Sequence, residues 1–128
     1  MDNPHKGRTG LDRLLRACGY SVQGLWAAYR GESAFRQEFW AAVVLVPAAF
    51  WVGRNWVETV LLIGSVVLML IVELLNSGIE AVVDRVSYEM HPLSKRAKDL
   101  GSAAVFLSVG SCAALWLATM WLHWGAGS

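Results

Sequence analysis

The sequence has few charged residues for its length. Only 16% of its 128 residues are Asp, Glu, Lys or Arg, whereas 55% are hydrophobic. This composition excludes an ordinary soluble domain and indicates one membrane domain covering residues 1–128. The net charge of +1 gives no basis for nucleic-acid binding through bulk charge. Because the first 38 residues hold ten charges, we also expect no cleaved signal peptide.

Motifs for several common kinds of site are also missing. Cys18 and Cys112 lie in an amphipathic stretch and an apolar run, so neither a disulfide nor a cysteine metal site is expected. His5, His91 and His123 are too scattered for a zinc site or a serine–histidine pair. No G-x-x-x-x-G-K-[ST] or G-x-G-x-x-G occurs, which excludes a P-loop and the phosphate loops of Rossmann proteins and protein kinases. Any phosphate site in this chain is therefore of another kind.

Long hydrophobic stretches, by contrast, are abundant. Three apolar runs predict three transmembrane helices, because about 20 residues are needed to cross the hydrocarbon core. The predicted spans cover about 36–54, 58–83 and 98–122. The segment of about 10–31 gathers its apolar residues on one face of a helix, which predicts an amphipathic helix at the membrane interface. The predicted fold class is an all-α membrane protein made of these four helices.

Basic residues predict the orientation of the chain. Six Lys and Arg residues, Lys6 and Arg8 among them, precede the first span, and four lie between the second and third. Only Arg54 lies on the other side. The positive-inside rule therefore places the N-terminus and the loop 84–99 in the cytoplasm and the C-terminus outside.

An acidic stripe interrupts the second span. Glu73, Asn76, Glu80 and Asp84 are separated by 3, 4 and 4 positions, which places them on one face of a helix. A charge at the bilayer centre costs about 2.5 to 3.5 kcal/mol even on the most lenient scale, so such residues face a bundle or a wet cavity. In the plainer interpretation, Glu73 and Asn76 form hydrogen bonds between helices and the other two mark the helix end. Two glutamates with an asparagine between them, next to a basic loop, favour a functional stripe instead.

The stripe could support phosphoryl transfer. Glu73, partly buried among apolar residues, suits a general base that takes a proton from an alcohol. Glu80, joined by another carboxylate such as Glu32, could hold Mg²⁺, which takes few protein oxygens and completes its shell with substrate phosphates.

Basic residues at the start of the third span could bind the phosphate oxygens. Taken alone, they are explained more simply as positive-inside anchors. They are Lys95, Arg96 and Lys98, and Asp99 beside them could bind a nucleotide hydroxyl or the metal.

Three ordered motifs give the chain a resemblance to a known family. They are "ESAFRQE" (32–38), "IVELLNSGIEAVVDR" (71–85) and "RAKDLGSAAV" (96–105). In this order, with three predicted spans and an amphipathic start, they resemble the small bacterial integral-membrane diacylglycerol kinases from about Leu11 to the third span. In two departures, Gly78 stands where alanine is common and Lys95 where a small residue is expected.

The resemblance implies ATP-dependent phosphorylation of membrane diacylglycerol to phosphatidic acid, in the bacterial inner membrane. It also implies a homotrimer whose active sites combine residues of neighbouring protomers. It places the general base on Glu73, a further active-site residue on Asn76, and the Mg²⁺ ligands on Glu32 and Glu80. In the mechanism we expect, Lys98 offsets the charge that develops in the transition state. The implied ATP contacts are Arg13, Tyr20, Glu32, Glu80, Glu89, Met90, His91, Lys98 and Asp99. The implied lipid contacts are Ser33, Ala34, Phe35, Arg36, Gln37, Glu38 and Glu73.

Three alternatives remain open at this point. Related kinases of the same architecture phosphorylate undecaprenol, although the intact "ESAFRQE" segment favours diacylglycerol. A small oligomeric proton or cation transporter could also use intramembrane acids, but it would need polar positions between Glu58 and Glu73, where only Thr59, Gly64 and Ser65 interrupt the apolar residues. A regulatory membrane subunit would leave the stripe and the basic loop unexplained.

Overall fold

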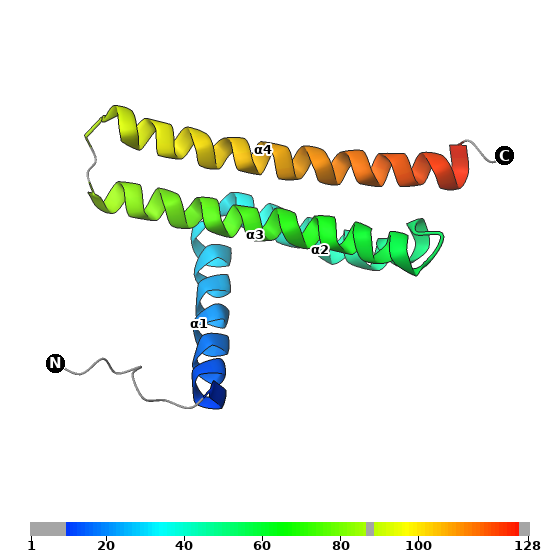
Figure 1. Ribbon diagram of the computed structural model, residues 1–128, viewed down its shortest axis with the longest axis horizontal. Helices are drawn as coiled ribbons and strands as arrows, with labels where there is room; N and C mark the ends of the chain where they lie inside the picture. Colours follow the sequence, from blue (N-terminus) through cyan, green and yellow to red (C-terminus); the bar gives the residue numbers. More distant parts are fainter. Residues whose placement is uncertain (1–9, 87–88, 126–128) are drawn as a thin grey trace.

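The computed structural model describes residues 10–86 and 89–125, and all the regular structure in them is helical (Figure 1). The elements are α1 (Gly10–Gly31), α2 (Ser33–Val52), α3 (Trp56–Val86), α4 (Pro92–Met120) and a π-helical turn, η1 (Trp121–Gly125). The all-α class predicted from the sequence is therefore confirmed. His5, Lys6 and Arg8, used in the sequence predictions, lie outside the described residues.

α3 is the central helix of the bundle. It packs against α4 and against α2, and α3 and α4 run antiparallel (Figure 1). The end where α3 passes into α4 is called here the α3–α4 end. The opposite end, which contains the α2–α3 turn and η1, is called the α2–α3 end. All the candidate site residues on α3 and α4 belong to the half of the bundle nearer the α3–α4 end.

α1 lies outside this bundle. It projects from the start of α2, across the direction of the other helices (Figure 1). Only Ala28 of α1 is buried. Its large apolar side chains remain exposed, including Leu11, Leu14, Leu15, Val22, Leu25 and Trp26. Such a face is what the predicted interfacial helix would present to lipid.

Two helical segments are long and apolar enough to cross a membrane, namely α3 and α4 continued by η1. α2 has 20 residues, but Arg36, Gln37 and Glu38 in its first two turns shorten its apolar stretch. The predicted crossing by residues 36–54 therefore stays a prediction, as does the homotrimer. Large apolar side chains such as Phe106 and Leu117 of α4 are exposed in the single chain. This exposure is expected of faces that meet lipid or other copies of the chain.

The core lies where α2, α3 and α4 meet. α2 contributes mostly small side chains, and α3 and α4 contribute larger ones. The buried cluster consists of Ala42, Ala49, Val52, Leu62, Val66, Cys112 and Trp116. Small residues let helix backbones approach closely, which allows α2 to pack along α3.

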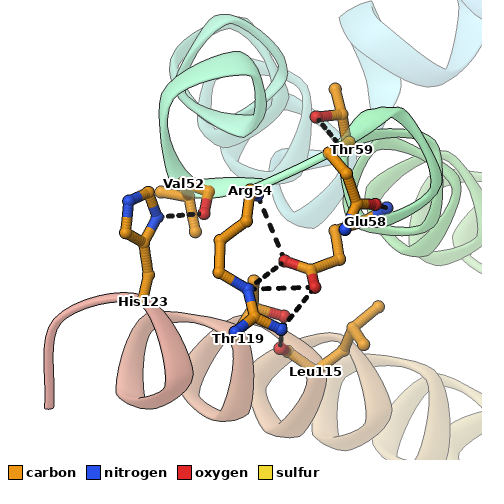
Figure 2. A network of polar contacts seen from close by, with 8 residues as sticks. Val52, Arg54, Glu58, Thr59, Leu115, Thr119 and His123 are labelled. Carbon is orange, nitrogen blue, oxygen red and sulfur yellow. Dashed lines mark hydrogen bonds and ion pairs between the residues drawn. The ribbon is translucent and has the colours of Figure 1, made fainter. Parts of the chain in front are cut away.

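Polar contacts fix the turn between α2 and α3 (Figure 2). Asn55 caps α3, because its Oδ1 accepts a hydrogen bond from Glu58 N at 3.0 Å. The Glu58 carboxylate in turn accepts a hydrogen bond from Arg54 Nη2 at 2.6 Å, and this contact raises the pKa of the Arg54 guanidinium. His123 Nδ1 lies 2.8 Å from the carbonyl oxygen of Val52, which ties η1 to the end of α2. The α2–α3 end is thus closed by contacts among three helical elements.

The turn requires a glycine at position 53, because Thr59 leaves no room there for a side chain. A Cβ at this position would collide with Thr59 Oγ1 and would lie 2.8 Å from Thr59 N. The Thr59 hydroxyl is itself held, since it donates to the carbonyl oxygen of Asn55 at 3.0 Å.

We expect Gly53→Ala to lower the stability of the protein, because either the turn or Thr59 must move. The loss should be about 1 to 3 kcal/mol, the usual effect of overpacking. Thermal unfolding in detergent micelles, followed by circular dichroism, measures it. Gly64→Ala is the matched control, since a Cβ at Gly64 meets nothing within 4 Å. Equal unfolding midpoints for the two variants would contradict the tight packing at Gly53.

Candidate active site

The acidic stripe of α3 faces the inside of the bundle. Glu73 and Asn76 are buried, with 6% and 9% of their surface exposed, and Glu80 and Asp84 are half-buried. Leu75 is 65% exposed on another face of the helix. α3 therefore directs its polar residues toward the other helices and keeps apolar side chains on its outer surface.

Two carboxylates from the start of α2 join the stripe. Glu32, the single residue between α1 and α2, and Glu38, in the second turn of α2, both interact electrostatically with Glu73. Glu73 also interacts with Glu80. In the part of the chain that the structure describes, none of these four residues forms an ion pair with a basic side chain. They are called here the carboxylate cluster.

The carboxylate cluster can accept a cation or a hydrogen-bond donor. Like charges that are partly removed from water repel one another and lose hydration energy, which a bound cation or donor offsets. Glu38 Oε2 is buried and has no hydrogen-bond partner in the described residues. The cluster therefore has unsatisfied capacity for a positive charge or a hydrogen-bond donor.

The donor chemistry of the cluster fits Mg²⁺ when a phosphate compound is also present. Among residues 10–86 and 89–125, no group of three Asp, Glu, His or Cys side chains could hold a metal ion. Glu32 and Glu80 would supply two carboxylates. Mg²⁺ is commonly bound through one or two carboxylates, with waters and substrate phosphates completing its shell.

Asn76 lies between the carboxylate cluster and α4. Its Nδ2 donates to Glu80 Oε1 at 3.4 Å, while its Oδ1 is buried with no partner in the described residues. Gly101 of α4 is buried against this amide, and a Cβ there would collide with Asn76 Oδ1 and lie 3.2 Å from its Cγ. No sequence pattern assigns a role to Gly101, because only the approach of α4 to α3 makes a glycine necessary there.

A second set of residues gathers at the α3–α4 end. They line a cavity of about 610 Å³ that also includes Asp84 and Lys95. Five residues expected to contact ATP lie there together, namely Glu89, Met90, His91, Lys98 and Asp99. His91 also caps α4, since its Nδ1 accepts a hydrogen bond from Leu93 N at 3.1 Å.

Two ion pairs border this cavity. Lys98 Nζ lies 2.8 Å from Asp84 Oδ1, and Lys95 Nζ lies 2.6 Å from Asp99 Oδ2. Lys98 also interacts electrostatically with Glu80, which links the cavity to the carboxylate cluster. The four paired side chains are between 46% and 75% exposed. Exposed ion pairs contribute little to stability, so either lysine can exchange its carboxylate for a phosphate oxygen.

The residues of the segment 33–38, expected to contact lipid, do not line one pocket in this chain. Phe35 is buried and borders an apolar cavity of about 590 Å³ between α1 and α2, together with Tyr29 and Phe39. Arg36 donates two hydrogen bonds to carbonyl groups of α1. Glu38 belongs to the carboxylate cluster. The remaining three, Ser33, Ala34 and Gln37, are exposed.

Arg13 and Tyr20 are not brought to the α3–α4 cavity of their own chain. Both lie on the exposed surface of α1 and neither lines that cavity. Their expected contact with ATP therefore stays a prediction that requires a neighbouring chain.

The fold and the site together define an all-helical protein with two helices long and apolar enough to cross a membrane and a candidate site for a phosphate compound at one end. The model of the family described as prokaryotic diacylglycerol kinase matches residues 19–120. The diacylglycerol kinase of Pseudomonas aeruginosa is 55% identical over 114 residues, which cover 89% of this chain and 93% of the relative. The diacylglycerol kinase of Escherichia coli K12 is 50% identical over 117 residues, which cover 91% of this chain and 96% of the relative.

The chain therefore belongs to the prokaryotic diacylglycerol kinase family. A more distant relative, the diacylglycerol kinase of Helicobacter pylori 26695, is 40% identical over 107 residues. These residues cover 84% of this chain and 84% of the relative. The family and the enzyme class that the sequence motifs predicted are confirmed.

Gly101→Ala should reduce kinase turnover about 10- to 100-fold, because a methyl group at this position displaces the Asn76 amide from the site. A coupled assay of ADP release at saturating substrates measures the change. Gly110→Ala, on the same helix with nothing within 4 Å of the added Cβ, serves as the matched control. If both variants lose the same activity, the effect comes from α4 in general and not from the contact with Asn76.

Proposed function

We propose that this protein transfers the terminal phosphoryl group of ATP to membrane diacylglycerol and so forms phosphatidic acid. The observation that carries the proposal is the carboxylate cluster, which forms no ion pair with a basic side chain in the described residues and lies close to a cavity lined by lysines. This arrangement suits a reaction that joins a lipid hydroxyl to a nucleotide phosphate. Membership of the family supports the same substrate class.

In the proposed reaction, Glu73 is the general base. The residue is buried, with 6% of its surface exposed, on a helix long and apolar enough to cross a membrane. It would take the proton from the lipid hydroxyl as the oxygen attacks the terminal phosphorus in line with the leaving ADP. Asn76, one turn along α3, would orient the reacting groups through its free Oδ1.

Glu32 and Glu80 would hold Mg²⁺, which when bound offsets the charge of the ATP phosphates. Glu80 lies within the electrostatic reach of Lys98. Lys98 would exchange Asp84 for a phosphate oxygen and stabilise the charge that develops in the transition state. Asp99, once released by Lys95, would be able to accept a hydrogen bond from a nucleotide hydroxyl.

The full site would combine two chains of a homotrimer. The support for this step is that Arg13 and Tyr20 lie on α1, away from the cavity that holds the other proposed ATP contacts. α1 projects from its own bundle (Figure 1), so its polar face is available to a neighbouring chain. We further propose that the α3–α4 end faces the cytoplasm of a bacterial cell, where ATP is present, and that the C-terminus is outside the inner membrane.

Among the described residues, α3 does not provide the continuous polar path that a transporter would need. Along α3, the buried residues between Glu58 and Glu73 are Thr59, Leu62, Val66 and Met69. Only Thr59 among them is polar, and its hydroxyl donates to a backbone carbonyl. A polar path from the carboxylate cluster to the α2–α3 end is therefore missing in the described residues.

Glu73→Gln should lower lipid phosphorylation about 10²- to 10⁴-fold, the usual contribution of a general base. The variant should still bind ATP and keep the oligomeric state of the parent protein. Transfer of labelled phosphate from ATP to lipid, fluorescent-nucleotide binding and size-exclusion chromatography measure the three properties. Glu58→Gln makes the same change on the same helix at the opposite end and should retain turnover. Unchanged turnover in Glu73→Gln would remove Glu73 as the base.

The lipid substrate can be tested directly. Purified protein is incubated with labelled ATP and Mg²⁺, and diacylglycerol and undecaprenol are offered side by side. We expect the label in phosphatidic acid. Label only in the polyprenol would reassign the lipid substrate, and label in neither would overturn the proposed reaction.

A further inference from the structure

The elbow between α1 and α2 is built from a single residue. α1 ends at Gly31 and α2 begins at Ser33, so Glu32 alone joins two helices that run in different directions (Figure 1). Its backbone is extended, with φ −121° and ψ 111°, and its side chain does not cap α2. Its backbone is bonded on both sides, since Glu32 N donates to the carbonyl oxygen of Ala28 at 2.9 Å and its own carbonyl oxygen accepts from Arg36 N at 3.1 Å. These bonds are local, so the angle of α1 is further held by a side-chain contact across the elbow.

Arg36 supplies that contact. Its Nη1 donates to the carbonyl oxygen of Tyr29 at 2.8 Å and to that of Arg30 at 3.0 Å. Both carbonyls belong to the last turn of α1, where backbone acceptors lack partners within the helix. A guanidinium there also interacts favourably with the negative end of the helix dipole. One side chain of α2 thus satisfies the end of α1 and holds the two helices at a set angle.

Aromatic residues of α1 and α2 also contact each other at this elbow. The Tyr29 hydroxyl accepts a hydrogen bond from Trp40 Nε1 at 3.1 Å. The rings of Tyr29 and Phe39 meet edge to face at 5.5 Å. Tyr29 is therefore bound to α2 both through its carbonyl group and through its side chain.

The elbow determines where Glu32 points. Glu32 borders a crevice between α1 and α3 that also includes Leu74, Ser77 and Gly78, and it interacts electrostatically with Glu73. A change in the angle of α1 would move the Glu32 carboxylate relative to α3. Glu80 lies on α3, so it would not move together with Glu32.

We propose that Arg36 is a positioning residue, which locks the elbow and so keeps Glu32 facing α3. The part of this inference that concerns Mg²⁺ rests on the proposed function. This role differs from the lipid contact that the sequence motif implied for Arg36, because the guanidinium donates its hydrogen bonds to the backbone of α1.

The first test measures the elbow itself. Cys18 on α1 is exposed and Cys112 is buried, so a nitroxide reagent labels Cys18 together with a cysteine introduced at exposed Leu117. Labelled chains are diluted with unlabelled ones, and pulsed electron paramagnetic resonance gives the distance distribution within one chain. Arg36→Gln should broaden or shift this distribution, and Arg36→Lys should partly restore it. An unchanged distribution in Arg36→Gln would overturn the inference.

The second test measures the consequence for the site. The Mg²⁺ concentration for half-maximal turnover should rise roughly tenfold in Arg36→Gln, as expected for the loss of charged hydrogen bonds, while the KM for lipid stays the same. Arg30→Gln is the matched control, because it removes a neighbouring positive charge whose guanidinium lies over Trp26 of the same helix. A raised lipid KM with an unchanged Mg²⁺ requirement would overturn the positioning role.

Glu32→Gln separates this inference from the proposed function. If Glu32→Gln raises the Mg²⁺ requirement and Arg36→Gln does not, the proposed metal ligand stands and the positioning role is wrong. If neither variant changes the Mg²⁺ requirement while the distance distribution of Arg36→Gln still broadens, the metal role of Glu32 is wrong and the elbow contact stands.

Discussion

A carboxylate that enters an apolar bundle must keep either a proton or a cation, and this requirement organises the α3–α4 half of the protein. Glu73 satisfies it neither with a basic side chain of the described residues nor through exposure to water. The surrounding helices are arranged around this carboxylate, whose charge no basic side chain neutralises through an ion pair in the described residues. α2 brings two more carboxylates, and α4 brings Gly101, whose missing side chain leaves room for Asn76. Lys98 of α4 interacts electrostatically with Glu80, but the direct ion pairs of Lys98 and Lys95 are with Asp84 and Asp99. A cation from outside the chain can therefore supply the direct compensation that the cluster lacks.

The two ends of the bundle differ in how their charged and polar side chains are paired. At the α2–α3 end, Arg54 and Glu58 neutralise each other at 2.6 Å, and Asn55, Thr59 and His123 bind backbone groups. These contacts close the turn and leave little capacity for a ligand. At the α3–α4 end, exposed lysines form ion pairs that exchange easily, next to carboxylates that form no ion pair in the described residues. One end therefore acts as a structural clamp, and the other has the chemical groups of a site.

Much of this organisation could be predicted from the sequence, and the limits have physical causes. Helical periodicity alone placed Glu73, Asn76, Glu80 and Asp84 on one face, because that property depends only on local spacing. The resemblance to the family, and not the spacing, implied ATP contacts at Glu89, Met90, His91, Lys98 and Asp99, which the structure places around one cavity. The contact between Gly101 and Asn76 could not be predicted, because it depends on how closely two helices approach. Likewise, Arg36 binds backbone carbonyls, which every residue possesses, so no side-chain pattern reveals its partner.

The elbow also has a mechanical consequence. α1 has 22 residues, so it forms a rod of about 33 Å whose only covalent joint to the bundle is Glu32. When a rod turns about a joint, its far end moves most and the joint itself moves least. The N-terminal turns of α1 therefore form a long lever, and a small force on them exerts a large torque at the joint. The hydrogen bonds from Arg36 to the last turn of α1 lie close to the pivot, so they must resist this torque if the Glu32 carboxylate is to keep facing α3.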